Sequence, residues 1–310
     1  MKLSIVATLY QSDPHVVEFF TRASAMGRQL VEDDYEIIFV NDGSPDRSLE
    51  LALEIARLDP HAVVVDLSRN FGHHKAMMTG LKYAKGDLVF LIDSDLEESP
   101  EWLLSFADHM TEQKCDVVFG VQATRKGQAF ERLTGWLFYR AFRFFTGIAH
   151  PNNIATARLM SRRYVDALLL HKEREINIGG LWLITGFKQT PIVVHKKSTS
   201  PTTYSFSKKV HHFINAVTSF SSLPLVFTFY SGCLISLSAL LYIGYLAFLY
   251  FYVSSPPSGY TSTIASIWLF SGLIIFFLGV QGIYISKLFS EVKRRPYTIV
   301  REVYRKSDQG

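Results

Sequence analysis

Residues 87–95 read Asp-Leu-Val-Phe-Leu-Ile-Asp-Ser-Asp, an apolar run that ends in two carboxylates. The run Leu88–Ile92 has the length and composition of a buried strand. Asp93 and Asp95 are two positions apart, so in an extended chain their side chains point the same way. A hard divalent cation prefers carboxylate oxygens and usually keeps substrate phosphates among its ligands. The stretch therefore predicts a metal site at the end of a buried strand, although a solvated loop can carry the same tripeptide.

Strand-like and helix-length segments alternate over the first half of the chain. The strand-like runs are Leu3–Thr8, Tyr35–Asn41, Ala62–Leu67, Leu88–Ile92 and Asp116–Val121. The helix-length segments are 14–30, 46–58 and 73–85. This alternation indicates βαβ units and a parallel sheet in an α/β fold. Ligands of such sheets bind beyond the carboxyl ends of the strands, so we expect Asp42, Asp93 and Asp95 to share one rim.

Two common phosphate-binding sequences are absent. The loop after the first strand, 10–14, has no Gly-x-Gly-x-x-Gly, and the chain has no Gly-x-x-x-x-Gly-Lys-Ser/Thr. Their absence disfavours a dinucleotide enzyme and a P-loop hydrolase, and it favours a diphosphate held by a metal ion. We expect no nucleic-acid partner.

Two long uncharged segments follow in the C-terminal third. Residues 225–253 and 264–286 contain no charged side chain, and a short segment with prolines and a glycine joins them. At about 1.5 Å per residue, each is long enough to cross a hydrocarbon layer of roughly 30 Å. We expect a transmembrane hairpin over 225–286. Small residues that permit close packing of such helices, and hence a homo-oligomer, are Gly272, Gly279 and Gly282.

Basic residues flank the predicted hairpin on both sides. Lys208 and Lys209 precede it, and a basic tail over 287–310 follows it. Because cationic flanks stay cytoplasmic, both termini are expected in the cytoplasm, with the chain as a multi-pass protein of the cytoplasmic (inner) membrane. The formal net charge of +4 suits an anionic membrane. The first ten residues have no cleavable signal pattern.

Two further segments have an amphipathic helical pattern. Within 126–148, phenylalanines and leucines take one side of the helix, whereas arginines, Trp136 and Tyr139 take the other. That pattern predicts a helix in the membrane interface, and a surface helix with solvated arginines is the alternative. Apolar residues also recur at helical spacing within 205–224, which indicates a juxtamembrane helix. Residues 1–204 remain as a cytoplasmic catalytic domain.

Four short sequences, taken in order, resemble those of family-2 glycosyltransferases. They are Val40-Asn41-Asp42-Gly43-Ser44-Pro45-Asp46, Arg69-Asn70-Phe71-Gly72 with Ala76 and Gly80, Asp93-Ser94-Asp95-Leu96-Glu97-Glu98-Ser99-Pro100, and Thr218-Ser219-Phe220-Ser221. The last resembles the segment that leads into the membrane hairpin of polyprenyl-phosphate glycosyltransferases. The chain is thus similar, over nearly its whole length, to the branch that includes dolichol-phosphate mannose synthase.

This resemblance implies a GT-A (Rossmann-like) fold, a UDP- or GDP-linked sugar donor and Mg²⁺ or Mn²⁺. By position, Asp42 would hold the nucleotide base, Asp93 would lie near the ribose and diphosphate, and Asp95 would coordinate the metal. Tyr10 and Asn70 would complete the donor site. Simpler roles exist for two of them: Asp42 suits a turn, and Asn70 suits the cap of the helix that follows.

The acceptor motifs of the family are altered in this chain. The family's arginine pair after the fifth strand becomes Gln122 and Arg125, and Asn153 stands where relatives have an aspartate. A hydroxyl acceptor needs a general base, which an amide cannot supply; Glu173 or Glu175 could serve instead. A lipid phosphomonoester has a second pKa of about 6 and needs no base.

We therefore expect an inverting, metal-dependent transfer of a sugar from a nucleotide sugar to polyprenyl (undecaprenyl) phosphate at the cytoplasmic membrane face, for a cell-envelope glycan. Arginine holds phosphate with a bidentate fork. Residues expected to bind the acceptor phosphate are Arg125, Arg132, Arg158 and Lys197. The alternatives are transfer to a hydroxyl of a lipid-linked saccharide, and a non-catalytic membrane scaffold that binds nucleotide sugars.

Overall fold

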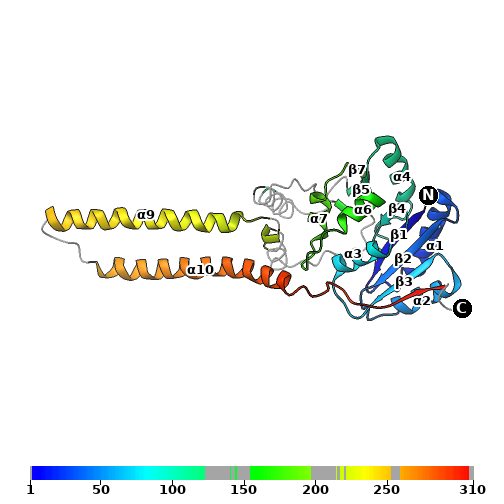
Figure 1. The fold of residues 1–310 in the computed structure, drawn as a ribbon, viewed down its shortest axis with the longest axis horizontal. Coiled ribbons are helices and arrows are strands. Elements are labelled where there is room, and N and C mark those ends of the chain that lie inside the picture. The colour runs from blue at the N-terminus through cyan, green and yellow to red at the C-terminus, as the bar shows by residue number, and fades with distance from the viewer. Residues whose placement is uncertain are drawn as a thin grey trace. The chain divides into compact units, whose positions relative to one another are not determined.

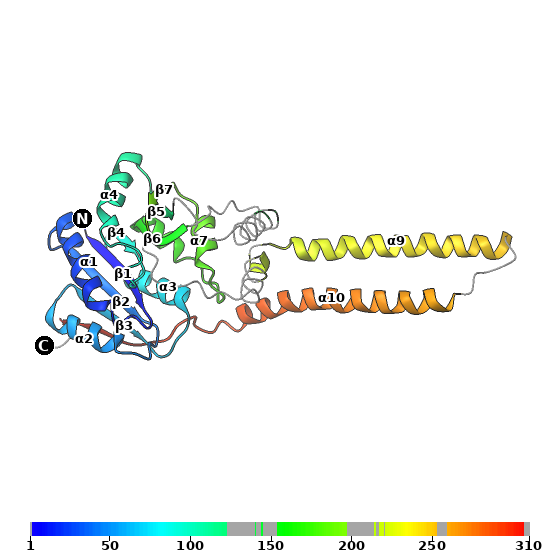
Figure 2. The same cartoon turned by 180° about the vertical axis from the view of Figure 1, so that it is seen from behind.

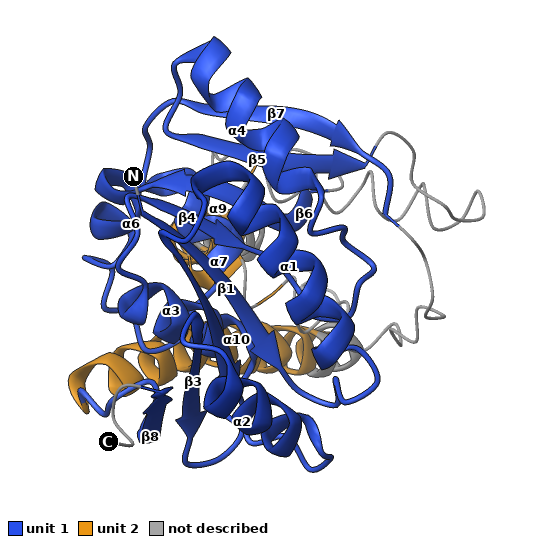
Figure 3. Cartoon of the chain, turned by 90° about the vertical axis from the view of Figure 1, so that its right-hand side faces the viewer, with its two compact units in different colours: residues 1–139, 148–205, 294–310 blue, residues 140–147, 206–293 orange. Residues whose placement is uncertain are grey.

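The structure is a computed structural model, and it describes residues 2–122, 140, 144, 154–196, 214, 217–219, 221–252 and 259–306. The chain forms two compact units (Figure 3). Unit 1 consists of residues 1–139, 148–205 and 294–310, and unit 2 consists of residues 140–147 and 206–293. Of the predicted helix within 126–148 the structure describes residues 140 and 144, and of the one within 205–224 it describes 214, 217–219 and 221–224.

Unit 1 is built on one eight-stranded sheet with the strand order β7-β5-β6-β4-β1-β2-β3-β8 (Figure 1). The strands are β1 (Leu3–Leu9), β2 (Tyr35–Asn41), β3 (Ala62–Leu67), β4 (Leu88–Leu91), β5 (Val117–Gln122), β6 (Ile154–Ser161), β7 (Gln189–Val194) and β8 (Val300–Arg305). The strands β1 to β4 run parallel, whereas β6 and β8 pair antiparallel with their neighbours. The predicted α/β fold is confirmed, and the sheet is mixed rather than wholly parallel.

Helices cover both faces of the sheet (Figures 1 and 2). The helices of unit 1 are α1 (Val16–Val31), α2 (Ser48–Leu58), α3 (His73–Tyr83), α4 (Trp102–Gln113), α6 (Arg162–Leu168) and α7 (Ile178–Ile184). Ile5 and Ala7 of β1 belong to the core cluster that also contains buried residues of α1, α2 and α4. Val6, between them, points to the opposite face, where it meets α3.

Helix α3 packs very closely on the sheet, and one glycine allows this. A Cβ atom at Gly80 would lie 2.4 Å from Val6 Cγ1 and 2.9 Å from Val40 Cγ2. Gly43, in the turn after β2, has φ +62°. A Cβ atom at this position would lie 2.4 Å from the Asn70 backbone nitrogen. These glycines therefore let the segment that includes α3 approach the ends of β1 and β2.

The C-terminal segment differs from the predicted basic tail over 287–310. Residues 287–292 continue a helix, and Val300–Arg305 form β8, which pairs antiparallel with β3 at the edge of the sheet. Arg301 Nη1 donates to Asp66 Oδ2 at 3.0 Å, and Asp66 is buried in β3. The backbone of β8 thus pairs with the edge of β3, and Arg301 compensates the buried carboxylate of Asp66, which the composition alone did not indicate.

Unit 2 contains the helices α9 (Leu223–Tyr252) and α10 (Tyr260–Val292). Within the part of the chain that the structure describes, one segment, Ser266–Val292, is long and apolar enough to cross a membrane by length and composition. The corresponding apolar stretch of α9, Leu223–Ala239, is shorter. The predicted spans 225–253 and 264–286 fall on these two helices, and the hairpin itself remains a prediction.

Replacing Gly80 with alanine is expected to destabilise unit 1 by about 1–3 kcal/mol, because the added methyl group overlaps Val6 and Val40. Thermal unfolding of the detergent-solubilised chain measures the loss. The double variant Gly80→Ala/Val6→Ala makes room for the methyl group and should lose less than the sum of the two single variants. Strictly additive losses would contradict close packing of α3 on β1.

Candidate active site

The carboxyl ends of β1, β2, β3 and β4 meet along one rim of unit 1, because these strands are parallel and adjacent. The segments that leave this rim carry most of the predicted donor-site residues. Tyr10 follows β1, Asp42 follows β2, Asn70 follows β3, and Asp93 and Asp95 follow β4. The strand order therefore brings the carboxylates to one rim of the sheet, as predicted.

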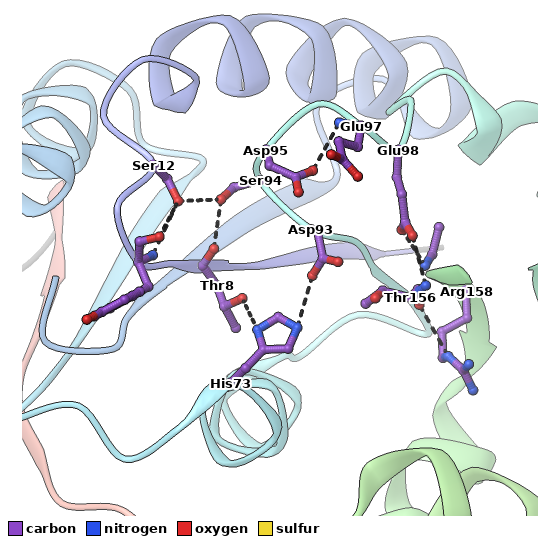
Figure 4. A network of polar contacts seen from close by, with 12 residues as sticks. Thr8, Ser12, His73, Asp93, Ser94, Asp95, Glu97, Glu98, Thr156 and Arg158 are labelled. Carbon is purple, nitrogen blue, oxygen red and sulfur yellow. Dashed lines mark hydrogen bonds and ion pairs between the residues drawn. The ribbon is translucent and has the colours of Figure 1, made fainter. Parts of the chain in front are cut away.

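Asp93 forms an ion pair with His73, the first residue of α3 (Figure 4). His73 Nε2 lies 3.2 Å from Asp93 Oδ1, and His73 Nδ1 lies 3.1 Å from Thr8 Oγ1. Burial acts to raise the pKa of Asp93, but the bond and charge of His73 hold this pKa below its usual value. Burial acts to lower the pKa of His73, but Asp93, with Asp42 and Asp95, raises it overall. The pair keeps a carboxylate ionised at the end of β4.

Ser94 fixes the turn between the two carboxylates. It is buried, its hydroxyl donates to the Thr8 carbonyl at 2.8 Å, and its oxygen lies 3.1 Å from Ser12 Oγ. Because Ser94 is anchored to the loop after β1, the side chains on either side of it are directed away from that loop (Figure 4). Ser94, the middle residue of the Asp-x-Asp sequence, therefore anchors this turn to β1 and the loop after it. The amino-acid sequence alone did not reveal this role.

Asp95 has the charge and the oxygen chemistry that a divalent cation requires. Its pKa is raised by burial and by the nearby Asp93, while a 3.0 Å bond from the Glu97 backbone N–H partly offsets this. A carboxylate in that position is stabilised by a cation. No group of three His, Cys, Asp or Glu side chains among the described residues is placed to hold a metal. Asp95 therefore fits Mg²⁺ or Mn²⁺ only if substrate phosphates supply further ligands, as they commonly do.

Glu98 is a buried carboxylate of this region, and sequence reasoning missed it. It is 1% exposed and accepts bonds from the Thr156 and Ala157 backbone N–H groups at 2.9 and 2.7 Å. Lys196 Nζ lies 3.7 Å from it. Burial, followed by repulsion from Asp93, raises the pKa of Glu98 to about 7. Glu98 ties the loop after β4 to β6, a strand that is distant in sequence.

Asp42 holds the loop that leads into α3. Its two carboxylate oxygens accept bonds from the Phe71 and Gly72 backbone N–H groups at 2.7 and 3.0 Å, and the residue is 2% exposed. Burial raises the pKa of Asp42, and these two bonds oppose the rise. Asp42 thereby fixes the position of His73, the residue at which α3 begins. Contact with a nucleotide base remains a prediction for this residue.

The other predicted residues fall into two groups. Tyr10 is 48% exposed and Asn70 is exposed, so both are accessible at the rim. The α3 N-cap is Gly72, without a side-chain bond, so the alternative role of Asn70 as a helix cap is wrong. Residues of the acceptor prediction that lie outside the described residues are Arg125, Arg132, Asn153 and Lys197.

Arg158, the described member of the acceptor prediction, lies inside the protein. It is 1% exposed, and its guanidinium carbon lies 2.9 Å from the centroid of the Trp182 ring. Burial lowers the pKa of Arg158 to about 9. Arg158 is thus enclosed beside Trp182, and its contact with an acceptor phosphate remains a prediction.

Comparisons with known proteins agree on one family. The sequence profile described as glycosyl transferase family 2 matches residues 4–169. A Mycobacterium tuberculosis protein named as a glycosyltransferase is 48% identical over 304 residues, covering 98% of this chain and 89% of that protein. The glycosyltransferase YkcC of Bacillus subtilis is 35% identical over 98% of this chain and 94% of its own length. The SfII prophage-derived bactoprenol glucosyl transferase of Shigella flexneri is 28% identical over 98% of this chain and 99% of its own length.

The protonation of Glu98 predicts a pH dependence of stability. The unfolded chain loses this proton near the ordinary value of 4.5, whereas the folded chain holds it until about 7. The free energy of unfolding should therefore fall as the pH rises from 4.5 to 7, by at most about 1.4 kcal/mol per pH unit. Glu98→Gln should flatten this part of the curve, measured by thermal unfolding at a series of pH values. Glu112→Gln, an exposed glutamate of α4, is the control; equal curves for both variants would contradict the assignment.

Proposed function

This chain belongs to glycosyl transferase family 2, and we propose that within this family it transfers a sugar from a nucleotide sugar to polyprenyl phosphate at the cytoplasmic face of a membrane. The observation that carries the proposal is the placement of Asp93 and Asp95 at the carboxyl end of β4, beside His73 and the buried Asp42. Such a rim is where α/β sheets bind their ligands.

The donor half of the reaction is assigned to these carboxylates. Asp95 would hold Mg²⁺ or Mn²⁺, which neutralises charge that develops on the leaving nucleoside diphosphate. Asp93, kept ionised by His73, would lie near the ribose and diphosphate. Tyr10, Asp42 and Asn70 complete the proposed donor site. Asp42 acts there at least through the loop that it holds by two backbone bonds.

The proposed acceptor is based on the relative named as a bactoprenol glucosyl transferase. That relative aligns with nearly the whole of this chain. A polyprenyl phosphate is largely dianionic at neutral pH and can attack the anomeric carbon without a general base. Attack on the face opposite the leaving group inverts that carbon. Arg125, Arg132 and Lys197 are proposed to hold the acceptor phosphate. Glu98 is unsuited to serve as a base for a hydroxyl, because it is 1% exposed and an acceptor has no open access to its oxygens.

The position of β8 supports the proposed membrane hairpin. Strands β1–β3 and β8 belong to one sheet, so the chain before α9 and the chain after α10 must lie on the same side of any membrane. The segment between them therefore crosses an even number of times. If α10 spans the bilayer through Ser266–Val292, a second crossing is required, and the 30-residue α9 can supply it. We propose two spans with both termini in the cytoplasm.

Asp95→Asn should reduce sugar transfer by about a hundredfold or more, since it removes the carboxylate that would hold the metal. The assay uses purified protein with labelled UDP- and GDP-sugars and measures released nucleoside diphosphate and labelled lipid. Asp108→Asn, an exposed aspartate of α4, is the matched control and should remain active. Chelation with EDTA should abolish transfer, and Mg²⁺ or Mn²⁺ should restore it.

Two acceptors separate the proposal from its alternatives in the same assay. Labelled product with polyprenyl phosphate alone supports the proposal, whereas product only with a lipid-linked saccharide identifies a hydroxyl acceptor. Undiminished function of Asp95→Asn would instead leave the chain as a non-catalytic binding protein.

Cysteine labelling in intact cells tests the hairpin. After Cys115→Ser and Cys233→Ser, a cysteine introduced as Ser258→Cys, between the two helices, should react with a membrane-impermeant maleimide from outside. Ser307→Cys, just after β8, should react only once the membrane is permeabilised. Labelling of both positions from the same side would rule out two crossings.

A further inference from the structure

A cavity of about 320 Å³ lies on unit 1 at the side of α3. Three segments that are distant in sequence form it: α3, the loop before α7, and the residues between α10 and β8. The residues that give it its chemical character are Thr79, Lys82, Tyr83, Arg174, Tyr297 and Thr298. Its volume is close to the lower limit, about 300 Å³, for small-molecule sites.

Two threonines join the walls of this cavity. Thr79 donates its hydroxyl proton to the Lys75 carbonyl at 2.9 Å, so the 2.8 Å contact between the Thr79 and Thr298 hydroxyls has Thr298 as the donor. This bond holds the segment after α10 against α3. Because both hydroxyl protons are used within the protein, the donors that face a ligand must come from the cations and the tyrosines.

The cavity is lined by side chains that donate hydrogen bonds, namely Lys82, Arg174 and the two tyrosines. Burial raises the pKa of Tyr297, while the positive charge of Arg174 nearby partly lowers it. Tyr297 therefore keeps its hydroxyl proton at neutral pH and can donate it. The described residues that line the cavity include two cations and no carboxylate. Such a set suits an anion with several acceptor oxygens, and phosphate is the common example.

This cavity is distinct from the donor site. His73, at the start of α3, contacts Asp93, whereas Thr79 and Lys82 lie six and nine residues further along the helix. At 1.5 Å per residue, these positions are about 9 and 14 Å from His73 along the helix axis. A phosphate held here would be too far from Asp93 to attack a sugar bound there.

The covalent connection to α10 indicates where the anion comes from. Only four residues, Lys293–Pro296, separate the candidate span Ser266–Val292 from Tyr297, and three of them are basic. Basic residues just beyond a membrane span favour anionic lipid head groups. The cavity is thus within a few residues of the point at which the chain would leave the bilayer.

We propose that this cavity binds the phosphate group of an anionic membrane lipid, at a site separate from those of the nucleotide sugar and the polyprenyl acceptor. Lys82, Arg174 and Tyr297 contact the phosphate oxygens. The bound head group then joins α3 to the segment that follows α10. The inference rests on the proposed membrane span of α10, and it does not depend on the sugar-transfer reaction.

The test measures binding without turnover. The full chain, purified in a neutral detergent, is titrated with dihexanoylphosphatidylglycerol while its thermal unfolding is followed. We expect a saturable rise in the unfolding temperature. Lys82→Gln/Arg174→Gln should raise the half-saturating concentration more than about tenfold, because two charge-assisted hydrogen bonds are lost. Arg28→Gln/Arg57→Gln, which removes two exposed cations from α1 and α2, should leave that concentration unchanged.

Further arms identify the ligand. Tyr297→Phe removes one hydroxyl and should weaken binding to a smaller extent, and it carries the test if the double variant fails to fold. Inorganic phosphate that stabilises the chain at the same concentration as the lipid would overturn the lipid as the source. Equal weakening in both double variants would show non-specific charge attraction and overturn the site. A rise in the KM for polyprenyl phosphate in Lys82→Gln/Arg174→Gln, without loss of lipid binding, would also overturn it.

Discussion

The ionised Asp93, whose side chain is only 18% exposed, is the constraint on which the rest of the site depends. A carboxylate that is largely removed from water needs a compensating charge or hydrogen bond, and His73 provides it from the first turn of α3. Asp42 holds the two backbone N–H groups just before His73 and so helps to position it. Gly80 then lets α3 lie close enough to β1 for that geometry. The family sequence motifs thus form one connected set of contacts. Through it, residues that are far apart in the sequence hold the charge of Asp93 in place.

The parallel half of the sheet could be predicted because its information is local. Each of β1 to β4 is an apolar run bounded by turn residues, and parallel connectivity places their ends together. Strands β6 and β8 could not be predicted in this way, since their places depend on pairing with β4, β5 and β3. Val300–Arg305 does not alternate regularly between apolar and charged residues, and its pairing with β3 shifts register between Asp66 and Leu67.

The same distinction holds for the site. Asp42, Asp93 and Asp95 could be found from the chain, because they follow strands directly. The residues that contact Asp93 and Glu98 could not be found in this way. His73 stands beside another histidine with no periodic signal, and Glu98 is engaged by the backbone of β6, a strand that was not anticipated. Arg158 is the converse: its residue type suggested an exposed phosphate ligand, whereas its position in the middle of the sheet encloses it against Trp182.

The C-terminal strand also bears on how the protein is made. Strand β3 exposes an unpaired edge until β8 is added, and β8 emerges from the ribosome only after both apolar helices. An open edge is a template for pairing with other chains. Contacts between segments so distant in sequence also form slowly. The nascent chain therefore carries an incomplete sheet throughout the synthesis of its apolar helices, and the edge of β3 stays open to pairing with other chains for that time.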